Sequence, residues 1–264
     1  MKIGVIGLGI IGNACKHGFE KVGHEVIGHD ITLDTKIEDV LDTEVCYVCV
    51  PTPSTEDGDC NTSIVEEVVL KLNDLGYKGI IVIKSTVKPN TTEYLARKIN
   101  TEICFVPEFL RERCAISDFI ENHKLLAVGT HSEFVYDMIV KCHGSLPEHC
   151  RMVKPTEAEL LKYYSNIFNA LKVIFANEMY EICKYMNVDY KAIKDAFILR
   201  DTAKDIYLDV NDNFRGYGGM CLPKDTKAIN YFVKKNNLDL KLFETIDVEN
   251  NKFKTTVFEG MRLK

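Results

Sequence analysis

The chain has 264 residues, of which 46% are hydrophobic and 27% charged, a composition that predicts a folded globular protein and excludes a disordered or fibrous one. Its formal net charge of −6 argues against nucleic-acid binding, which needs basic surface to replace the counterions of phosphates. No apolar run approaches the roughly 20 residues that cross a bilayer, and glycines interrupt the apolar stretch 3–11, so neither a membrane partner nor a signal peptide is expected.

The first half of the chain alternates short apolar strands with helices. Strands are predicted over 2–7, 25–30, 45–50, 79–85, 102–106 and 125–129, and helices over 10–22, 64–75 and 91–98. Short apolar strands joined by helices form a parallel sheet that is covered on both faces. We therefore expect an α/β domain with a doubly wound parallel sheet over residues 1–154.

After residue 154 the pattern becomes helical. Thr156 and Glu159 have the spacing of a capping box, and apolar residues then recur at helical spacing, without Pro or Gly, to about Tyr185. Further helices are predicted over 190–199, over 223–235 and from 240 to the end. Residues 155–264 are therefore expected to form a small all-helical domain, whose long first helix is a candidate dimer element.

The ten cysteines are scattered singly through apolar stretches, which is typical of reduced thiols in a cytoplasmic protein and not of a disulfide framework. Cys46 and Cys49 form a C-x-x-C pair, but residues three apart on a strand point to opposite faces of the sheet. Two core cysteines are therefore favoured over a metal site, and no metal ligands are predicted.

The sequence Gly7-Leu8-Gly9-Ile10-Ile11-Gly12 follows the first strand and opens the first helix. Its glycines permit a tight turn, close approach of the backbone to a pyrophosphate and close packing of helix on strand, with the helix N-terminus facing the anion. Asp30 ends the second strand, where the ribose hydroxyls of NAD are held, and a carboxylate there repels the 2′-phosphate of NADP. The pattern predicts a Rossmann-type NAD site; the alternative is a glycine-rich turn with a structural role only.

Residues 216–225 read Gly-Tyr-Gly-Gly-Met-Cys-Leu-Pro-Lys-Asp. The glycines free the backbone to approach a ligand, and Cys221 precedes a proline that favours the first turn of a helix. The helix N-terminus and Lys224 are expected to lower the pKa of the Cys221 thiol, as in a nucleophile, and Asp225 lies one turn on to handle a proton or a water. From the residue pattern alone, a structural cysteine remains the default interpretation.

Further polar residues occur where ligands bind in such folds. Lys162 and Asn166 lie four apart on one face of the long helix, which suits stabilisation of an oxyanion, although spacing alone favours solvated surface residues. Glu108, Glu112 and the segment 84–86 follow strands at the carboxyl edge of the predicted sheet. Polar clusters on the edge that carries the glycine-rich turn indicate a crevice.

Together these motifs resemble the UDP-glucose and GDP-mannose dehydrogenase family, most of all its bacterial UDP-glucose 6-dehydrogenase members. The resemblance covers nearly the whole chain and rests on the segments 7–12, 50–53, 84–87, 107–112, 162–166 and 216–227. The last of these, GYGGMCLPKDTK, is highly specific. The resemblance implies NAD-dependent four-electron oxidation of a nucleotide sugar, with UDP-glucose to UDP-glucuronate as the first expectation, through a thiohemiacetal and a thioester on Cys221.

The resemblance also assigns roles to individual residues. Lys162 and Asn166 would stabilise oxyanions, while Asp225, Thr86 and Glu112 would position or activate water. The implied NAD contacts are Gly7, Gly9, Ile11, Gly12, Asp30, Thr52, Thr86, Glu112 and Lys224. The implied sugar contacts are Glu108, Phe109, Leu110, Arg111, Lys162, Asn166 and Gly218. A homodimer through the long helix is expected as well.

Three features depart from the family pattern. Family members continue into a further α/β domain that binds the nucleotide, and this chain stops at Lys264. Asp205-Ile206-Tyr207 replaces an Arg-Ile-Gly triplet whose Arg reaches the neighbouring subunit's substrate, so weaker nucleotide-sugar binding is expected. Asn90 replaces a Gly, a milder change because Asn tolerates left-handed geometry. The alternative hypothesis is therefore a truncated NAD-binding homologue without turnover of its own, as a remnant, a regulatory subunit or half of a two-chain enzyme.

Overall fold

The computed structural model describes residues 1–201 and 203–254. The chain divides into two compact units, one made of Met1–Pro53 and Cys60–Lys162 and the other of Ser54–Asp59 and Tyr163–Lys264. None of the ten cysteines, all of which lie in the described ranges, forms a disulfide.

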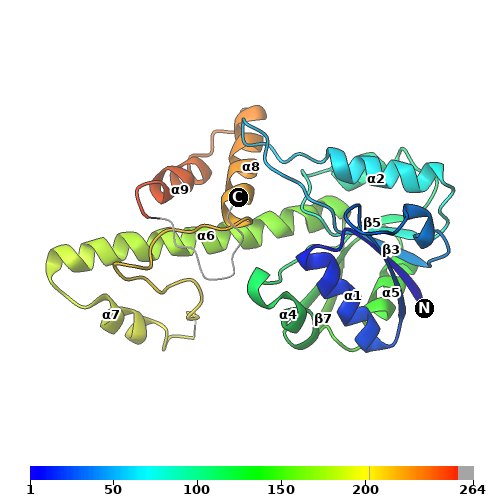
Figure 1. The fold of residues 1–264 in the computed structure, drawn as a ribbon. Helices are drawn as coiled ribbons and strands as arrows, with labels where there is room; N and C mark the ends of the chain where they lie inside the picture. Colours follow the sequence, from blue (N-terminus) through cyan, green and yellow to red (C-terminus); the bar gives the residue numbers. More distant parts are fainter. Residues whose placement is uncertain (202, 255–264) are drawn as a thin grey trace. The chain divides into compact units, whose positions relative to one another are not determined.

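The first unit is built on a seven-stranded sheet in the order β2-β1-β3-β4-β5-β6-β7 (Figure 1). The strands are β1 (Lys2–Ile6), β2 (Glu25–His29), β3 (Val45–Val48), β4 (Ile80–Ile83), β5 (Ile103–Phe105), β6 (Leu125–Gly129) and β7 (His149–Val153). Neighbouring strands are parallel except β5 and β6, which meet antiparallel at Phe105 and Gly129. The predicted doubly wound sheet is confirmed, with β7 added at its edge, and the antiparallel pair of β5 and β6 departs from the parallel arrangement that was predicted.

Helices cover both faces of this sheet and form two separate cores. On one face lie α1 (Ile10–Val22), α4 (Ala115–Glu121) and α5 (Glu133–His143). On the other lie the 3₁₀ helix η1 (Ile37–Val40), α2 (Ser63–Asp74), α3 (Thr91–Ala96) and the start of α6. Because both faces are buried, the inner strands consist of uninterrupted apolar residues, which is why the sequence pattern identified them.

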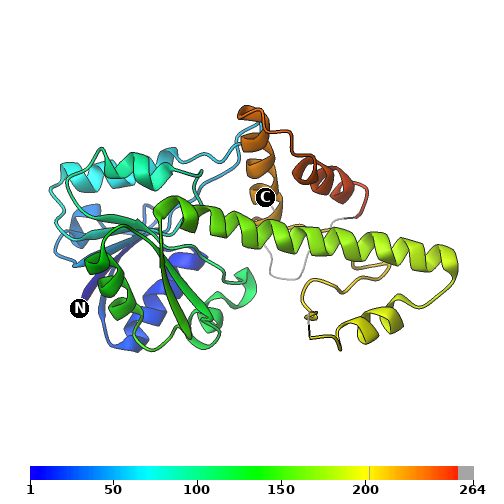
Figure 2. The same cartoon turned by 180° about the vertical axis from the view of Figure 1, so that it is seen from behind.

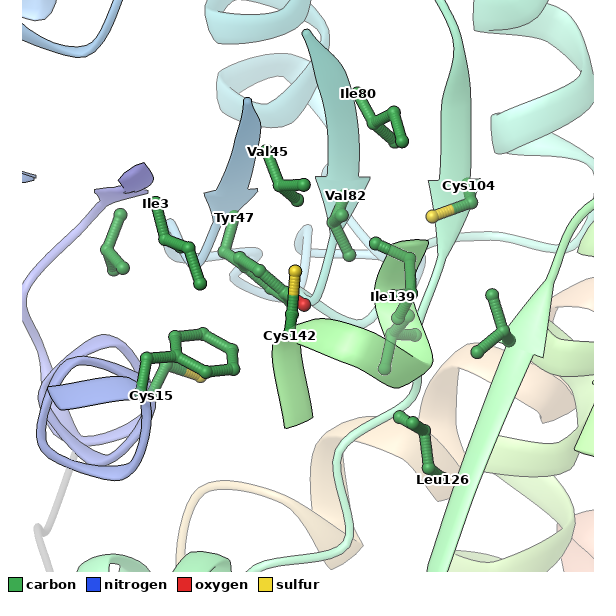
Figure 3. Close-up of a cluster of buried hydrophobic side chains, with 14 of the residues drawn as sticks. Ile3, Cys15, Val45, Tyr47, Ile80, Val82, Cys104, Leu126, Ile139 and Cys142 are labelled. Carbon is green, nitrogen blue, oxygen red and sulfur yellow. The ribbon is translucent and has the colours of Figure 1, made fainter. Parts of the chain in front are cut away.

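Tyr47 of β3 lies in the first core, which gathers side chains from β1, β3, β4, β5 and β6 and from α1, α4 and α5 (Figure 3). The Phe19 ring of α1 lies 4.6 Å from the Tyr47 ring, centroid to centroid. Side chains alternate along β3, so that Tyr47 belongs to this core and Cys46 to the other. Cys49 packs against the first core, which confirms that Cys46 and Cys49 point to opposite faces.

The long helix α6 (Pro155–Met186) runs unbroken for 32 residues, as predicted (Figure 2). It begins two residues earlier than the predicted capping box requires: Lys154 takes the N-cap position, and Glu157 accepts the backbone N–H of Lys154 at 2.8 Å. Thr156 therefore lies inside the first turn. The capping box of Thr156 and Glu159 is wrong.

Glu159 instead joins α6 to the loop before α3 and to its first turn. Its buried carboxylate accepts the backbone N–H of Asn90 at 2.5 Å and both the N–H and the hydroxyl of Thr92 at 2.7 and 2.6 Å. Ala158 beside it is fully buried in the second core. These contacts hold the first turns of α6 on the sheet, so the compact first unit extends to Lys162, whereas the sequence placed the boundary after residue 154.

The second unit contains the remainder of α6 together with α7 (Tyr190–Phe197), α8 (Leu222–Lys235) and α9 (Leu242–Asn250). A small core of Ala176, Cys183, Tyr190 and Val210 joins α6, α7 and the following loop. The helix predicted from 240 to the end stops at Asn250 in the structure, and residues 255–264 lie outside the described residues. Among the helices that the structure describes, none is long and apolar enough to cross a membrane.

Candidate functional site

The glycine-rich turn lies between the ends of β1 and β3, where the strand order reverses direction and such sheets open a crevice. Gly7 has a φ of +88°, and a Cβ there would lie 2.7 Å from the carbonyl oxygen of Cys49. A Cβ on Gly12 would lie only 1.8 Å from the carbonyl oxygen of Gly7. A Cβ on Gly9 would meet nothing within 4 Å. Gly7 and Gly12 therefore serve the tight packing of the turn, and Gly9 leaves space open.

The open space at Gly9 adjoins the N-terminus of α1. Gly9 is the N-cap and has no side chain to accept the amides of the first turn, which contains no acidic residue. The half-buried Ile11 lies in that first turn. The amides and the positive dipole end of this helix N-terminus attract an anion, and Gly9 has no side chain to keep the anion away from the backbone. The site therefore fits the pyrophosphate of a dinucleotide.

Asp30 follows β2 at the same edge of the sheet. Its Oδ1 accepts the hydroxyl and the N–H of Thr32 at 2.7 and 2.9 Å, and its Oδ2 accepts the N–H of Leu8 at 2.7 Å. The hydrogen bonds from Thr32, followed by that from Leu8, hold the pKa of Asp30 below its ordinary value. The carboxylate is therefore charged and directly beside the glycine-rich turn, which fits the ribose hydroxyls of NAD.

Replacing Asp30 by Asn is expected to weaken NAD binding by about tenfold to a hundredfold, since a hydrogen bond to a charged group is lost. The loss for NADP is expected to be smaller, because the repulsion of its 2′-phosphate disappears. Titration calorimetry with both dinucleotides measures this ratio, with the exposed Asp34→Asn as the control. Equal losses for NAD and NADP would contradict the assignment of Asp30.

The remaining predicted NAD contacts of the first unit follow its other strands. Thr52 is buried after β3, Thr86 is half-buried after β4, and Glu112 opens the 3₁₀ helix η2 (Glu112–Cys114). The hydroxyl of Ser85 donates to the carbonyl of Val50 at 2.7 Å, which ties the loops after β3 and β4 together. These residues share the carboxyl edge of the sheet with the glycine-rich turn.

A buried ion pair lies at the ends of β4 and β5. Lys84 Nζ is 2.9 Å from Glu108 Oε2, and both residues are less than a tenth exposed. Glu108 Oε1 accepts the N–H groups of Phe109 and Leu110 at 2.6 and 2.8 Å. Lys162 on α6 donates to the backbone carbonyl of Glu108, and its Nζ lies 5.9 Å from the centre of the Phe109 ring. The structure thus brings Lys162 to the predicted sugar-contact segment 108–110.

Two pKa shifts describe this pair. Burial alone would raise the pKa of Glu108, but the Lys84 charge and hydrogen bond, followed by the Lys162 charge, hold it below its ordinary value. Burial alone would lower the pKa of Lys84, but Glu108 keeps it above its ordinary value. Both groups are therefore charged at neutral pH. Lys84 is absent from the predicted site residues, although it stands at a strand end and in the segment 84–87 that carries the family resemblance.

Arg111, a predicted sugar contact, is held by a residue that the sequence analysis missed. Its guanidinium makes two hydrogen bonds to Asp118, at 2.9 and 2.6 Å, and its backbone N–H makes a third at 3.0 Å. These bonds, with the side-chain bond first, lower the pKa of Asp118 to about 2. The side chain of Arg111 nevertheless remains 60% exposed.

The second unit contains Cys221 together with the predicted site residues Asn166, Lys224 and Asp225. Cys221 is exposed at the N-cap of α8, and Pro223 lies in the first turn of that helix as predicted. The N–H of Asp225 donates to the Cys221 carbonyl at 2.9 Å. The Asp225 carboxylate is buried and accepts from Asn166 at 2.6 Å and from Lys224 at 2.7 Å.

The glycine-rich loop that leads to Cys221 is fixed by Asn250 of α9. The Asn250 amide accepts the N–H of Tyr217 at 2.8 Å and donates to the Tyr217 carbonyl at 3.0 Å. Gly218, a predicted sugar contact, directly follows this clamp and is half-buried, and Gly219 has a φ of +76°. No pattern around Asn250 in the sequence indicated this role.

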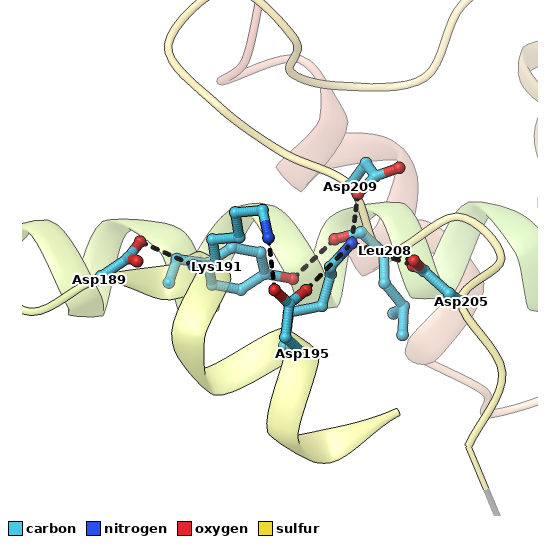
Figure 4. Close-up of polar contacts among 8 residues, drawn as sticks. Asp189, Lys191, Asp195, Asp205, Leu208 and Asp209 are labelled. Carbon is cyan, nitrogen blue, oxygen red and sulfur yellow. Dashed lines mark hydrogen bonds and ion pairs between the residues drawn. The ribbon is translucent and has the colours of Figure 1, made fainter. Parts of the chain in front are cut away.

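Asp205 is bound to Lys194 of α7. Lys194 Nζ lies 3.2 and 3.1 Å from the two carboxylate oxygens of Asp205 and 2.5 Å from Asp209, within a larger polar cluster (Figure 4). The negative charge expected to weaken nucleotide-sugar binding is thus paired inside the unit. Tyr207 has a φ of +65° at the position of the family's Gly. Asn90 has a φ of +77°, which confirms the left-handed geometry expected there.

Within residues 1–201 and 203–254, no three His, Cys, Asp or Glu side chains are grouped to hold a metal ion.

Comparison with known proteins identifies the family. Residues 32–144 match the NAD binding domain model of the UDP-glucose/GDP-mannose dehydrogenase family, and residues 156–252 match its central domain. The chain is 33% identical to UDP-glucose 6-dehydrogenase of Rickettsia bellii over 224 residues, 81% of this chain and 50% of that protein. It is 28% identical to GDP-mannose 6-dehydrogenase of Pseudomonas aeruginosa over 76% of this chain and 49% of that protein.

Among solved structures, a UDP-glucose dehydrogenase from Pyrobaculum islandicum superposes with a TM-score of 0.88 at 27% identity, over 95% of this chain and 68% of that one. The chain spans about half the length of the curated relatives it matches. The cofactor of its first unit is NAD, as predicted. With its glycine-rich turn and both matched domains, the chain belongs to the UDP-glucose/GDP-mannose dehydrogenase family.

Proposed function

We propose that the protein oxidises the primary alcohol of a nucleotide sugar to a carboxylate, with UDP-glucose as the first candidate substrate. The observation that carries this proposal is the arrangement around Cys221. An exposed thiol at a helix N-terminus precedes by one turn a buried carboxylate, Asp225, which is held by Asn166 and Lys224. This is the arrangement of a nucleophile with a group for proton transfer beside it.

Cys221 is the residue that makes a four-electron oxidation possible. When bound, NAD would supply the hydride acceptor for both oxidations, of the alcohol to an aldehyde and of the adduct to a thioester, so two NAD would be used per sugar. The Cys221 thiolate adds to the carbon of the aldehyde and forms a thiohemiacetal, a tetrahedral carbon that still carries a hydrogen. Loss of that hydrogen as a hydride, together with the proton of the hydroxyl group, leaves a thioester, and water hydrolyses it to the carboxylate and the free thiol.

The neighbouring residues have roles that match their chemistry. We assign Lys162 and Asn166, one turn apart on α6, to stabilising the oxyanions of the adducts, because an ammonium and an amide donate to developing negative charge. Asp225, with Thr86 and Glu112, positions or activates the hydrolytic water. The sugar contacts that we assign are Glu108, Phe109, Leu110, Arg111 and Gly218.

The test is NADH formation by the purified protein with UDP-glucose, GDP-mannose and UDP-N-acetyl sugars in turn. Two NADH per sugar consumed, with the uronate identified by mass spectrometry, is the expected result for one of them. A stoichiometry of one NADH per sugar would contradict the thioester route, since the reaction would then stop at the aldehyde.

The second candidate is an NAD-binding homologue without turnover of its own. It is favoured by Asp205, which stands where the family pattern has an Arg for substrate and which is bound to Lys194. In that case the protein binds NAD but forms no NADH with any of the sugars. NADH would form only after a second polypeptide that completes the enzyme is added. The same assay therefore separates the two candidates.

A homodimer through α6 is part of the proposal. Beyond Tyr163 the helix exposes Tyr164, Phe168, Phe175 and Ile182, whose spacings of four, seven and seven residues form one stripe. Each of these side chains is more than half exposed, and the rings of Tyr164 and Phe168 stack at 6.5 Å. Such a continuous apolar stripe is typical of a helix that packs against a second helix.

Replacing Phe168 and Phe175 together by Asp is expected to convert the dimer into the monomer of 30.0 kDa, because charges cannot be buried in this stripe. Light scattering with size-exclusion chromatography measures the mass. The control is Phe134→Asp, which alters an aromatic residue on α5 that is also more than half exposed. A wild-type protein that elutes only as a monomer would contradict the proposed dimer.

We also propose that the protein works in a reducing cytoplasm. The ten cysteines are all without disulfides, and most are buried in the apolar cores. The proposed chemistry requires Cys221 in its thiolate form, which an oxidising compartment would consume.

A further inference from the structure

Lys84 occupies an unusual position for a residue without an assigned role. It is 4% exposed at the end of β4, beneath the loop that follows β5. A buried ammonium without a counterion is strongly unfavourable, and Glu108 supplies the counterion at 2.9 Å. Replacing such a pair by apolar side chains is often neutral or stabilising, so stability alone does not explain its presence.

The Glu108 carboxylate connects Lys84 to the backbone of the next residues. One of its oxygens faces Lys84, and the other accepts the amides of Phe109 and Leu110. The carboxylate therefore fixes the turn in which Glu108 itself lies. The orientation of the Glu108 carbonyl depends on this turn, and that carbonyl is the acceptor for the ammonium of Lys162.

We propose that Lys84 is a positioning residue for Lys162, which acts through the Glu108 carboxylate and carbonyl to fix the direction of the Lys162 ammonium. The role of Lys162 in catalysis rests on the proposed function, whereas the positioning itself does not. Lys84 lies on β4, Glu108 after β5 and Lys162 on α6, so the three residues join the sheet to the long helix.

The proposal predicts a new pH dependence when the Lys84 charge is removed. In the wild type the pKa of Glu108 lies below its ordinary value, so the carboxylate stays charged as the pH falls toward 5. In Lys84→Met the burial of Glu108 remains but its counterion is lost, so its pKa rises. Protonation then removes acceptor capacity from the turn, and turnover of the variant is expected to fall as the pH falls.

Other ionisable groups surround the pair and have to be considered. Lys162 faces Glu108 from α6, Cys15 faces it from α1, and His123 faces it from the segment after α4. Cys49 and His143 lie close to Lys84. Burial lowers the pKa of both His123 and His143, so neither gains a charge that could replace that of Lys84. The loss of turnover at low pH, here called the acid limb, is therefore assigned to Glu108 by combining Lys84→Met with Glu108→Gln, because Glu108→Gln removes the titrating carboxyl.

The experiment compares Lys84→Met, Glu108→Gln and the double variant with the wild type. For Lys84→Met we expect kcat to fall about a hundredfold, because misplacing a catalytic group by about 1 Å has an effect of this size. The Kd for NAD is expected to be unchanged. The double variant, which leaves no unpaired charge, is expected to fold normally, to recover part of this loss and to show no acid limb. Thr43→Val is the control for a loss of stability alone. It removes a buried hydroxyl near the start of β3 that donates to the Val40 carbonyl at 2.7 Å.

A second readout does not depend on turnover. Acetylation of Lys162 by limiting acetic anhydride, followed by mass spectrometry, is expected to be severalfold faster in Lys84→Met than in the wild type, relative to the exposed Lys154. If no sugar is oxidised by the wild type, the proposed function fails but this labelling still decides the role of Lys84. Unchanged Lys162 labelling in Lys84→Met, together with an unchanged pH profile where turnover exists, would overturn the proposal.

Discussion

Replacing Cys221 by Ala is expected to abolish uronate formation, with a loss of turnover on the order of 10⁴-fold or more, because no other group can hold the aldehyde for the second oxidation. The side chain is exposed at the N-cap of α8, so its removal leaves the core unchanged. NAD binds to the first unit and is expected to bind the variant with unaltered affinity. Stopped-flow measurement of NADH and mass spectrometry of a trapped covalent adduct together test this expectation.

The matched control is Cys150→Ala, which removes a partly exposed thiol from β7 of the first unit. It is expected to leave the rate and the stoichiometry of two NADH per sugar unchanged. A Cys221→Ala variant that still produces two NADH per sugar would refute the thiol mechanism. A wild-type protein that forms no adduct, but still oxidises sugar fully, would do the same.

Elements that are buried on both faces were predictable because their apolar runs are continuous. β3 and β4 consist entirely of buried residues, and the sequence identified both. The edge strand β7 contains His, Cys and Arg and is half exposed, so it carries no such signal. α4 is a short helix of seven residues that follows a 3₁₀ turn, and α5 has a partly polar surface; neither was assigned.

The candidate site divides in the same way. Residues that belong to one local motif, such as Gly7 and Gly12 or Cys221 and Asp225, were predictable because the motif itself fixes their spacing. Partners that are distant in the sequence were not, since their pairing exists only in the folded chain. Glu159 matched the spacing of a capping box, yet it binds Thr92, 67 residues earlier, because a buried carboxylate requires several donors.

Asn250 and Lys84 show the same limitation in different forms. Asn250 clamps Tyr217 across 33 residues, and nothing in its own neighbourhood distinguishes it from a surface amide. Lys84 does stand in a motif, the segment 84–87, but nothing in that motif indicates that Lys84 pairs with the distant Glu108 carboxylate. In both cases the informative quantity is burial of a polar group, which a single sequence does not reveal.

Two alanine substitutions in the glycine-rich turn are expected to have opposite kinds of effect. At Gly12 the added Cβ would lie 1.8 Å from the carbonyl oxygen of Gly7, a backbone atom that cannot move aside. The start of α1 must then shift from β1, at a cost of about 1–3 kcal/mol in the free energy of unfolding. Gly12→Ala is therefore expected to lose both stability and NAD binding.

At Gly9 the added Cβ would meet nothing within 4 Å, and the φ of −72° there is ordinary for alanine. Gly9→Ala is therefore expected to unfold at the same denaturant concentration as the wild type. Its methyl group occupies the space beside the amides of α1 that the pyrophosphate needs, so NAD affinity is expected to fall at least about tenfold. Urea unfolding and calorimetric titration of both variants separate the two effects.

The pair of variants distinguishes a binding turn from a turn with a structural role only. If the glycines served packing alone, Gly9→Ala would bind NAD as tightly as the wild type, because no protein atom is displaced. Loss of NAD affinity in Gly9→Ala at unchanged stability can come only from a ligand that approaches the bare backbone at this point. The substitution that disturbs the fold least is therefore the one that reports most directly on where the cofactor lies.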